Sequence, residues 1–174
     1  MSLTPIALAD PEFDRIAIKV FESYPNACIS RIEKVEMDPK FEERFQNRLK
    51  DFKEHKIKDF KEPDVRELFH GTKVKNVESI LSDGFLVSKN VSSSLGKGTY
   101  FASYASYSVM GYTDKSKIWE LSYVFLSDVI LNDCNSGNRN HPGDNLQFIC
   151  ACRRDESCIP RYLISFYKDA DKIK

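Results

Sequence analysis

The sequence has neither the excess of positive charge that binds nucleic acid nor the long apolar run that spans a membrane. Lysine plus arginine and aspartate plus glutamate each total 26, so the formal net charge is zero and no summed positive field attracts a phosphate backbone. No apolar run approaches the ~20 residues that span a bilayer, and residues 1–10 lack the basic region and apolar core of a signal peptide. We therefore expect a soluble, intracellular protein, cytoplasmic or nuclear, with neither nucleic acid nor membrane as its default partner.

The sequence also lacks any Cys-x-x-Cys pair, and its five cysteines are an odd number. Hydrophobic residues make up 41% of the chain and aromatic residues 12%, which is enough to build the core of a single domain, residues 1–174, without disulfides. Four cysteines and a histidine gather late in the chain, at Cys134, His141, Cys150, Cys152 and Cys158. Because the apolar strand context favours buried thiols, a metal site is the weaker interpretation, and we expect free thiols and no metal.

Two helices are predicted in the N-terminal part of the chain. Asp10 and Asp38 have the residue type of helix N-caps, and a proline follows each at the first helical position. Apolar residues then recur at helical spacing over residues 11–24 and 39–52. A mixed run at residues 28–37 is a candidate strand between these helices.

Beyond residue 63 the sequence changes to short apolar runs separated by glycine and small polar residues. Alternation of apolar and polar residues from Trp119 to Phe125 indicates a strand with one buried face. The other candidate elements are a strand ending at residues 68–69, a helix around residues 76–81, and strands at residues 146–152 and 162–167. This mixture predicts an α+β domain built mainly on antiparallel sheet, with a few flanking helices.

Two short motifs are typical of a ligand site. His70 and Gly71 place an imidazole beside main-chain groups that a glycine leaves open to close approach, which suits a ligand with an amide group. Further along, Gly96 and Gly98 bracket a tight turn that delivers Tyr100 onto a strand. Taken alone, a histidine of this kind is more often structural than catalytic, so the interpretation depends on the motifs occurring together.

A third segment follows the second motif directly. A helix that begins near Ser103 places Ser108 and Tyr112 four residues apart on one face. Taken alone, Tyr100, Tyr107 and Tyr112 could equally be core or surface aromatic residues, and Tyr104 is interpreted as an ordinary aromatic residue of that helix.

Together these segments resemble the catalytic domain of the poly(ADP-ribose) polymerase family, particularly its mono-ADP-ribosylating members. His70-Gly71-Thr72 resembles the His-Gly-Ser/Thr element of that family, and residues 96–102 resemble its Gly-Lys-Gly-x-Tyr-Phe-Ala element. Residues 32–35 and 160–166 resemble its first and closing strands, so the likeness runs from residue 10 to residue 167. The resemblance implies the ADP-ribosyltransferase fold, a split β-sandwich, with NAD as co-substrate and no metal.

The resemblance also implies a role for each residue at the nicotinamide end of the site. The backbone N–H and C=O of Gly71 pair with the carboxamide, and Ser108 adds a hydroxyl donor to the same group. Tyr112 stacks on the pyridinium ring and Tyr100 closes the other side, where an aromatic face favours a cationic ring by about 0.5–2 kcal/mol.

On the adenosine side, the resemblance implies that His70 bonds a ribose hydroxyl, with Thr72 and Asn76 completing that half of the site. The serine-rich loop at residues 85–95 stands where the family has its donor loop, which covers the bound dinucleotide.

Two positions imply transfer of single ADP-ribose units. Chain-elongating members carry a late glutamate that polarises the acceptor sugar, and counting back from the closing strand without gaps places Ile149 there. Tyr107, also expected among the cofactor-binding residues, stands where those relatives carry a lysine. Gln147 lies two residues earlier on the same strand face and takes the polar role if the alignment contains a gap.

The resemblance therefore implies a monomeric enzyme that modifies protein side chains, itself included, without a helical regulatory domain. A second hypothesis is a binding module of the same fold that holds NAD or ADP-ribose without turning it over. A third, an RNA-end transferase, is disfavoured by the neutral net charge.

Overall fold

The computed structural model describes residues 1–54, 62–90, 93–114, 120–140 and 146–167. Its strands are β1 (Ser2–Pro5), β2 (Cys28–Glu36), β3 (Val65–Thr72), β4 (Thr99–Ala102), β5 (Leu121–Ile130), β6 (Cys134–Asn140), β7 (Leu146–Cys152) and β8 (Cys158–Tyr167). Its helices are α1 (Pro11–Phe21), α2 (Pro39–Lys53), α3 (Val74–Asp83) and α4 (Ala105–Tyr112), with short 3-10 turns η1 (Val87–Lys89), η2 (Leu131–Asp133) and η3 (Asp155–Ser157).

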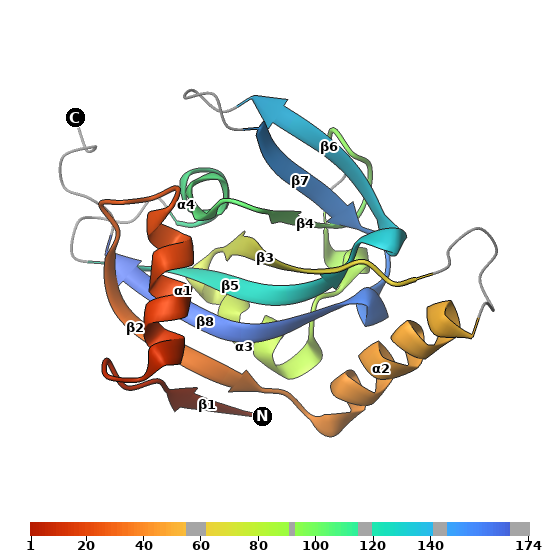
Figure 1. The fold of residues 1–174 in the computed structure, drawn as a ribbon, viewed down its shortest axis with the longest axis horizontal. Coiled ribbons are helices and arrows are strands. Elements are labelled where there is room, and N and C mark those ends of the chain that lie inside the picture. Colours follow the sequence, from red (N-terminus) through yellow and green to blue (C-terminus); the bar gives the residue numbers. More distant parts are fainter. Residues whose placement is uncertain (55–61, 91–92, 115–119, 141–145, 168–174) are drawn as a thin grey trace.

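The described strands form a sheet in the order β1-β2-β8-β5-β3-β4-β7-β6, and every neighbouring pair is antiparallel. β3 pairs with β5 along its whole length, but the described part of β4 pairs with β3 only at Phe69 and Ala102. Figure 1 shows β4, β7 and β6 turning away from the other five strands at this point. The predicted α+β class, built mainly on antiparallel sheet with a few flanking helices, is confirmed.

The predicted helix starts are confirmed as well. The carboxylate of Asp10 accepts a hydrogen bond from the backbone N–H of Glu12 at 2.9 Å, and Asp38 accepts one from Lys40 at 3.0 Å. The first helix ends at Phe21, whereas the prediction extended it to residue 24.

The helices cover the sheet from different sides. Residues of α1 and α4 join one buried cluster, which includes Ile16, Val109, Val124 and Ile164. Residues of α3 join a second cluster with Leu68, Phe101 and Phe125, and α2 packs at the end of the sheet near Ile130. Figure 1 shows α1 lying across the strands and α2 standing at one end of them.

One prediction about β5 is wrong. The alternation in the sequence predicts a single buried face, yet Ser122 is 1% exposed and Val124 is 0% exposed, like Phe125 on the opposite face. The reason is that β5 lies between β8 and β3 in the middle of the sheet, and Val124 and Phe125 belong to clusters on opposite faces. Trp119, predicted to begin this strand, lies outside the described residues.

All five cysteines are free thiols, as expected. Among the described residues, no group of three or more histidine, cysteine, aspartate or glutamate side chains could hold a metal ion, and His141 lies outside this part. Within the same ranges, no helix has both the length and the apolar character needed to cross a membrane.

Candidate functional site

A pocket of about 490 Å³ opens beside the end of β3, a volume typical of ligand sites. Its walls come from β3, the start of α3, the segment before β4, β4 itself and the end of α4. The lining residues are His70, Gly71, Thr72, Lys73, Asn76, Lys89, Asn90, Ser93, Gly98, Tyr100 and Tyr112. A smaller pocket of about 140 Å³ continues from it towards α3, because His70, Thr72, Asn76, Lys89 and Asn90 line both.

The structure brings most of the predicted site residues to this pocket. Those that line it are His70, Gly71, Thr72, Asn76, Tyr100 and Tyr112. Three others take different places: Ser108 lies buried behind Gly71, Tyr107 lies beside Tyr112, and Ile149 is buried in β7.

Gly71 lies against the backbone of α4. A Cβ atom placed on it would lie 2.0 Å from the backbone oxygen of Ser108 and 3.0 Å from Cβ of Tyr112. Because the first distance is far below any van der Waals contact with a backbone atom, only glycine fits here. Gly71, Ser108 and Tyr112 are therefore neighbours, as the sequence predicted.

The backbone of Gly71 has an edge that can meet a ligand. The carbonyl of Phe69 accepts a hydrogen bond from Oγ of Ser108 at 3.1 Å, so it faces α4 and away from β5. Backbone groups two residues apart on a strand face the same edge, and in the described part of β4 the pairing with β3 stops at Phe69. The N–H and C=O of Gly71 thus point to an edge that β4 does not cover, where an amide could pair with them. Because the Ser108 hydroxyl donates to Phe69, its donation to a carboxamide stays a prediction.

His70 is held in one tautomer by its neighbours. Its Nδ1 lies 2.8 Å from the backbone oxygen of Tyr100, and since a carbonyl can only accept, we assign the proton to Nδ1 and leave Nε2 as an acceptor. The rings of Phe85 and Phe101 pack against the imidazole with centroids 5.0 and 5.5 Å away. Burial lowers the pKa of His70 and outweighs the opposing effect of the Tyr100 carbonyl. A neutral imidazole with a free Nε2 suits a hydroxyl donor such as a ribose.

Tyr100 lines the pocket, and its hydroxyl forms two hydrogen bonds within the protein, which leaves the ring as the surface available to a ligand. The hydroxyl donates to the backbone oxygen of Gly96 at 2.8 Å and accepts from the N–H of Leu95 at 2.9 Å. Gly96 has φ +87°, a left-handed conformation that confirms the tight turn predicted there.

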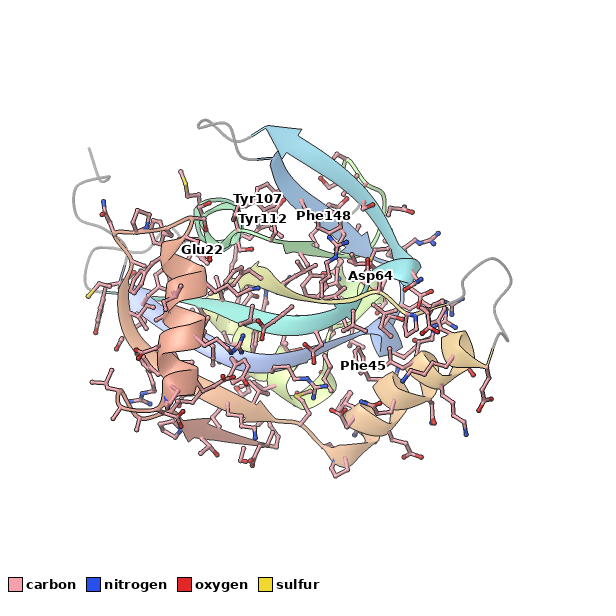
Figure 2. All side chains as sticks on the ribbon, in the orientation of Figure 1. Glu22, Phe45, Asp64, Tyr107, Tyr112 and Phe148 are labelled. Atoms are coloured by element: carbon pink, nitrogen blue, oxygen red, sulfur yellow. The ribbon has the colours of Figure 1, made fainter. Side chains whose placement is uncertain are left out.

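Tyr112 is 39% exposed and contacts Tyr107. The two hydroxyl oxygens lie 2.9 Å apart and the ring centroids 5.3 Å apart, and Figure 2 shows the pair beside each other at α4. Tyr107 lines a separate open pocket of about 380 Å³ with Met110 and Gly111, and Tyr112 lines both this pocket and the main one. Its role as a direct cofactor ligand stays a prediction.

Ile149 occupies the middle of β7, opposite Ala102 of β4 and Gly137 of β6. Tyr100 pairs with Ala151, two residues further along β7, so Ile149 and Tyr100 belong to the same face of these strands. The side chain is 1% exposed and has no polar atom. Gln147 follows the same alternation of the backbone, but its side chain lies outside the described part.

Sequence reasoning missed several lining residues: Lys73, Lys89, Asn90, Ser93 and Gly98. Lys73 directly follows the first motif, and Gly98 belongs to the second. The others lie in the serine-rich segment. The resemblance placed this segment over the bound dinucleotide, and that expectation could have identified them as lining residues. Within it, Asn90 is fixed by hydrogen bonds to the Leu86 carbonyl and to Oγ1 of Thr99, whereas residues 91–92 lie outside the described part.

The close approach at Gly71 generates the first prediction. Gly71→Ala should lower the free energy of unfolding by about 3 kcal/mol, because the methyl group forces β3 and α4 apart. Urea unfolding measures this change. Gly111→Ala is the matched control, since its Cβ would have nothing within 4 Å, and it should raise stability by about 0.5–1 kcal/mol. Equal stability of the two variants would contradict the close contact.

The second prediction concerns pH. Since the pKa of His70 is lowered in the folded protein, protons bind its unfolded state first as the pH falls below about 6.5. The stability due to neutral His70 is therefore complete above that pH and is lost as the pH falls towards the lowered value. Urea unfolding at several pH values should show a shallower decline for His70→Gln than for the unmodified protein, and parallel curves would argue against a lowered pKa of His70.

No curated protein matches this chain. The family model described as the poly(ADP-ribose) polymerase catalytic domain matches residues 12–145, a span that holds both motifs and the helix after them. The chain therefore belongs to the poly(ADP-ribose) polymerase family, and its domain is that of an ADP-ribosyltransferase that uses NAD as substrate.

Proposed function

We propose that this domain is a mono-ADP-ribosyltransferase, which transfers one ADP-ribose unit from NAD to a protein side chain and releases nicotinamide. The observation that carries the proposal is Ile149, a buried aliphatic residue on the strand face shared with Tyr100. The elongating glutamate is expected at that position, and an isoleucine can neither bond a ribose hydroxyl nor polarise an acceptor sugar.

The residues around the pocket fit NAD. The open backbone edge of Gly71 matches the donor and acceptor of a carboxamide, and the rings of Tyr100 and Tyr112 offer aromatic faces to a cationic ring. Nε2 of His70 accepts from a ribose hydroxyl, while Thr72 and Asn76 line both the main pocket and its extension.

NAD supplies a glycosidic bond that develops positive charge on the ribose as nicotinamide leaves. The contribution of the chain is to hold the ring and the ribose in fixed positions, so that the acceptor meets the correct carbon atom. The tautomer of His70 and the engaged hydroxyl of Tyr100 preorganise two of these contacts before any ligand binds.

Activation of the acceptor is left to the acceptor itself. Of the described residues that line the two pockets, none is an aspartate or glutamate. A carboxylate acceptor is already a competent nucleophile at neutral pH and needs no base. We therefore infer that aspartate or glutamate side chains of proteins, this one included, are the acceptors. We also propose that the enzyme is an intracellular monomer.

One observation favours the alternative of a binding module. The Ser108 hydroxyl donates to Phe69, so a carboxamide must compete for this donor or use the oxygen differently. Such a module would bind NAD without turnover.

The third prediction separates these two functions. Incubation with labelled NAD should leave label on the protein or an added acceptor as single units that form no ladder on a gel. His70→Ala should reduce the labelling rate about 100-fold, because the ribose loses its positioning contact. Thermal stabilisation by NAD without labelling would establish the binding module instead.

The fourth prediction tests the two positions that imply single units. Ile149→Glu should not produce long chains on its own, because Tyr107 still occupies the place of the lysine. Gel analysis of the labelled product shows the chain length, and Ile149→Gln controls for placing a polar group in β7. Ladders from Ile149→Glu alone would show that Tyr107 does not matter, and a melting curve confirms that each variant is folded.

A further inference from the structure

Four of the five cysteines gather in one part of the core. Cys134 begins β6, Cys150 and Cys152 lie in β7, and Cys158 begins β8. All four belong to the hydrophobic cluster around Phe101 or pack against it, and all four are free thiols. Neighbouring thiols can be joined by oxidation, so the distance and orientation within this cluster decide what it can do.

Cys134 and Cys152 stand directly opposite each other on neighbouring antiparallel strands. The backbone N–H of Arg153 donates to the carbonyl of Asp133 at 3.2 Å, one residue beyond the pair on each strand. This bond identifies Cys134 and Cys152 as a non-hydrogen-bonded pair, the type whose Cα atoms lie about 4.5 Å apart and whose side chains approach closely. That separation is within the roughly 4.4–6.8 Å that a disulfide spans.

The thiols of this pair contact each other and differ in acidity. The pKa of Cys152 is lowered, because hydrogen bonds from the thiols of Cys134 and Cys158 to its sulfur outweigh the effect of burial. The pKa of Cys134 is raised, because its contacts with Cys150 and Cys152 favour the protonated form. Since the thiolate is the reactive form of cysteine, Cys152 is the nucleophile of the pair and Cys134 is its partner.

A small oxidant can reach this pair from the outer strand. Cys152 is buried, whereas Cys134 is half-buried and begins β6, the last strand in the order of the described sheet. The end of an outer strand opens at a lower free energy than a central strand does. A molecule little larger than water, such as hydrogen peroxide, can therefore enter beside Cys134 and meet the sulfur of Cys152.

We propose that Cys134 and Cys152 are a redox pair, which forms a reversible cross-strand disulfide on reaction with hydrogen peroxide. The Cys152 thiolate attacks one peroxide oxygen and becomes a sulfenic acid, with release of hydroxide. The Cys134 thiol then attacks the sulfur of the sulfenic acid, whose hydroxyl leaves as water with the thiol proton. In total, two thiols lose two electrons and two protons, and the peroxide is reduced to two molecules of water.

The disulfide restrains the backbone beside the main pocket. Cys134 is followed by Asn135, whose side-chain amide donates to the backbone oxygen of Leu95 at 2.9 Å. The N–H of Leu95 in turn donates to the hydroxyl of Tyr100, which lines the pocket. A bond at Cys134 therefore holds β6 against β7 at the point from which β6 supports this loop.

The test treats the reduced protein with hydrogen peroxide and maps its disulfides by mass spectrometry of a non-reducing digest. The unmodified protein should lose the mass of two hydrogen atoms, link Cys134 to Cys152, and return to free thiols with dithiothreitol. Cys134→Ala and Cys152→Ala should each abolish this link. Cys158→Ala should retain it, because Cys158 is not a member of the opposing pair.

Cys150→Ala is the matched control. Cys150 is buried on the same strand face as Cys152 and contacts Cys134, but it lies opposite Ser136. The variant should form the link between Cys134 and Cys152 as fast as the unmodified protein does. Cys28→Ser should do the same, since it removes only the exposed thiol of β2. Melting curves of the reduced variants confirm that they are folded.

Two measurements test the restraint on the pocket wall. The oxidised protein should melt about 5–10 °C above the reduced protein, because the disulfide closes a loop in the unfolded chain. Hydrogen exchange at the Leu95 amide should also become slower on oxidation.

The outcomes are separable. If peroxide leaves the thiols free, or links Cys152 to Cys158 or Cys150 instead, the redox pair is overturned. If the link forms but neither the melting temperature nor the exchange at Leu95 changes, the restraint on the pocket wall is overturned. None of these measurements involves NAD, so a failure here leaves the proposed function untouched, and a failure of that function leaves the redox pair untouched.

Discussion

The contact between Gly71 and the backbone of α4 is the constraint on which the site depends. It sets the distance between β3 and α4, and it keeps Ser108 and Tyr112 beside the open edge of the strand. This contact lies where the sheet divides. The pairing of β4 with β3 stops at Phe69, and the pocket opens beside the next residues of β3. Packing of the core and shape of the site therefore depend on the same atoms.

The site combines groups of different electrical character. His70 is neutral because of burial, and the tyrosines present aromatic faces, so a cationic ring meets no positive side chain from these residues. Lys89 stands at the junction with the smaller pocket, and no aspartate or glutamate is among the described residues that line either pocket.

Much of this could be predicted from local signals. Asp10 and Asp38 cap the helices that follow them, and Gly96 adopts the left-handed turn. Gly71 was expected to give a ligand access to the main chain, and its close contact with the backbone of Ser108 in α4 was not predicted. Longer-range features could not be predicted. The strands β1 and β6 form by pairing with β2 and β7, a contact that their own residues do not indicate. The burial of β5 on both faces requires helices from elsewhere in the chain. Lys89 lies beside the pocket because the segment after α3 folds back against that helix.

Tyr100 ties together parts that are separate in the sequence. Its hydroxyl holds the loop at Leu95 and Gly96, while its carbonyl holds the imidazole of His70. An inhibitor that gained room by pushing this loop outward would break both hydroxyl contacts, at about 0.5–1.5 kcal/mol each, and would loosen the histidine as well. Compounds that leave the loop in place should therefore bind more tightly for their size than larger ones that displace it.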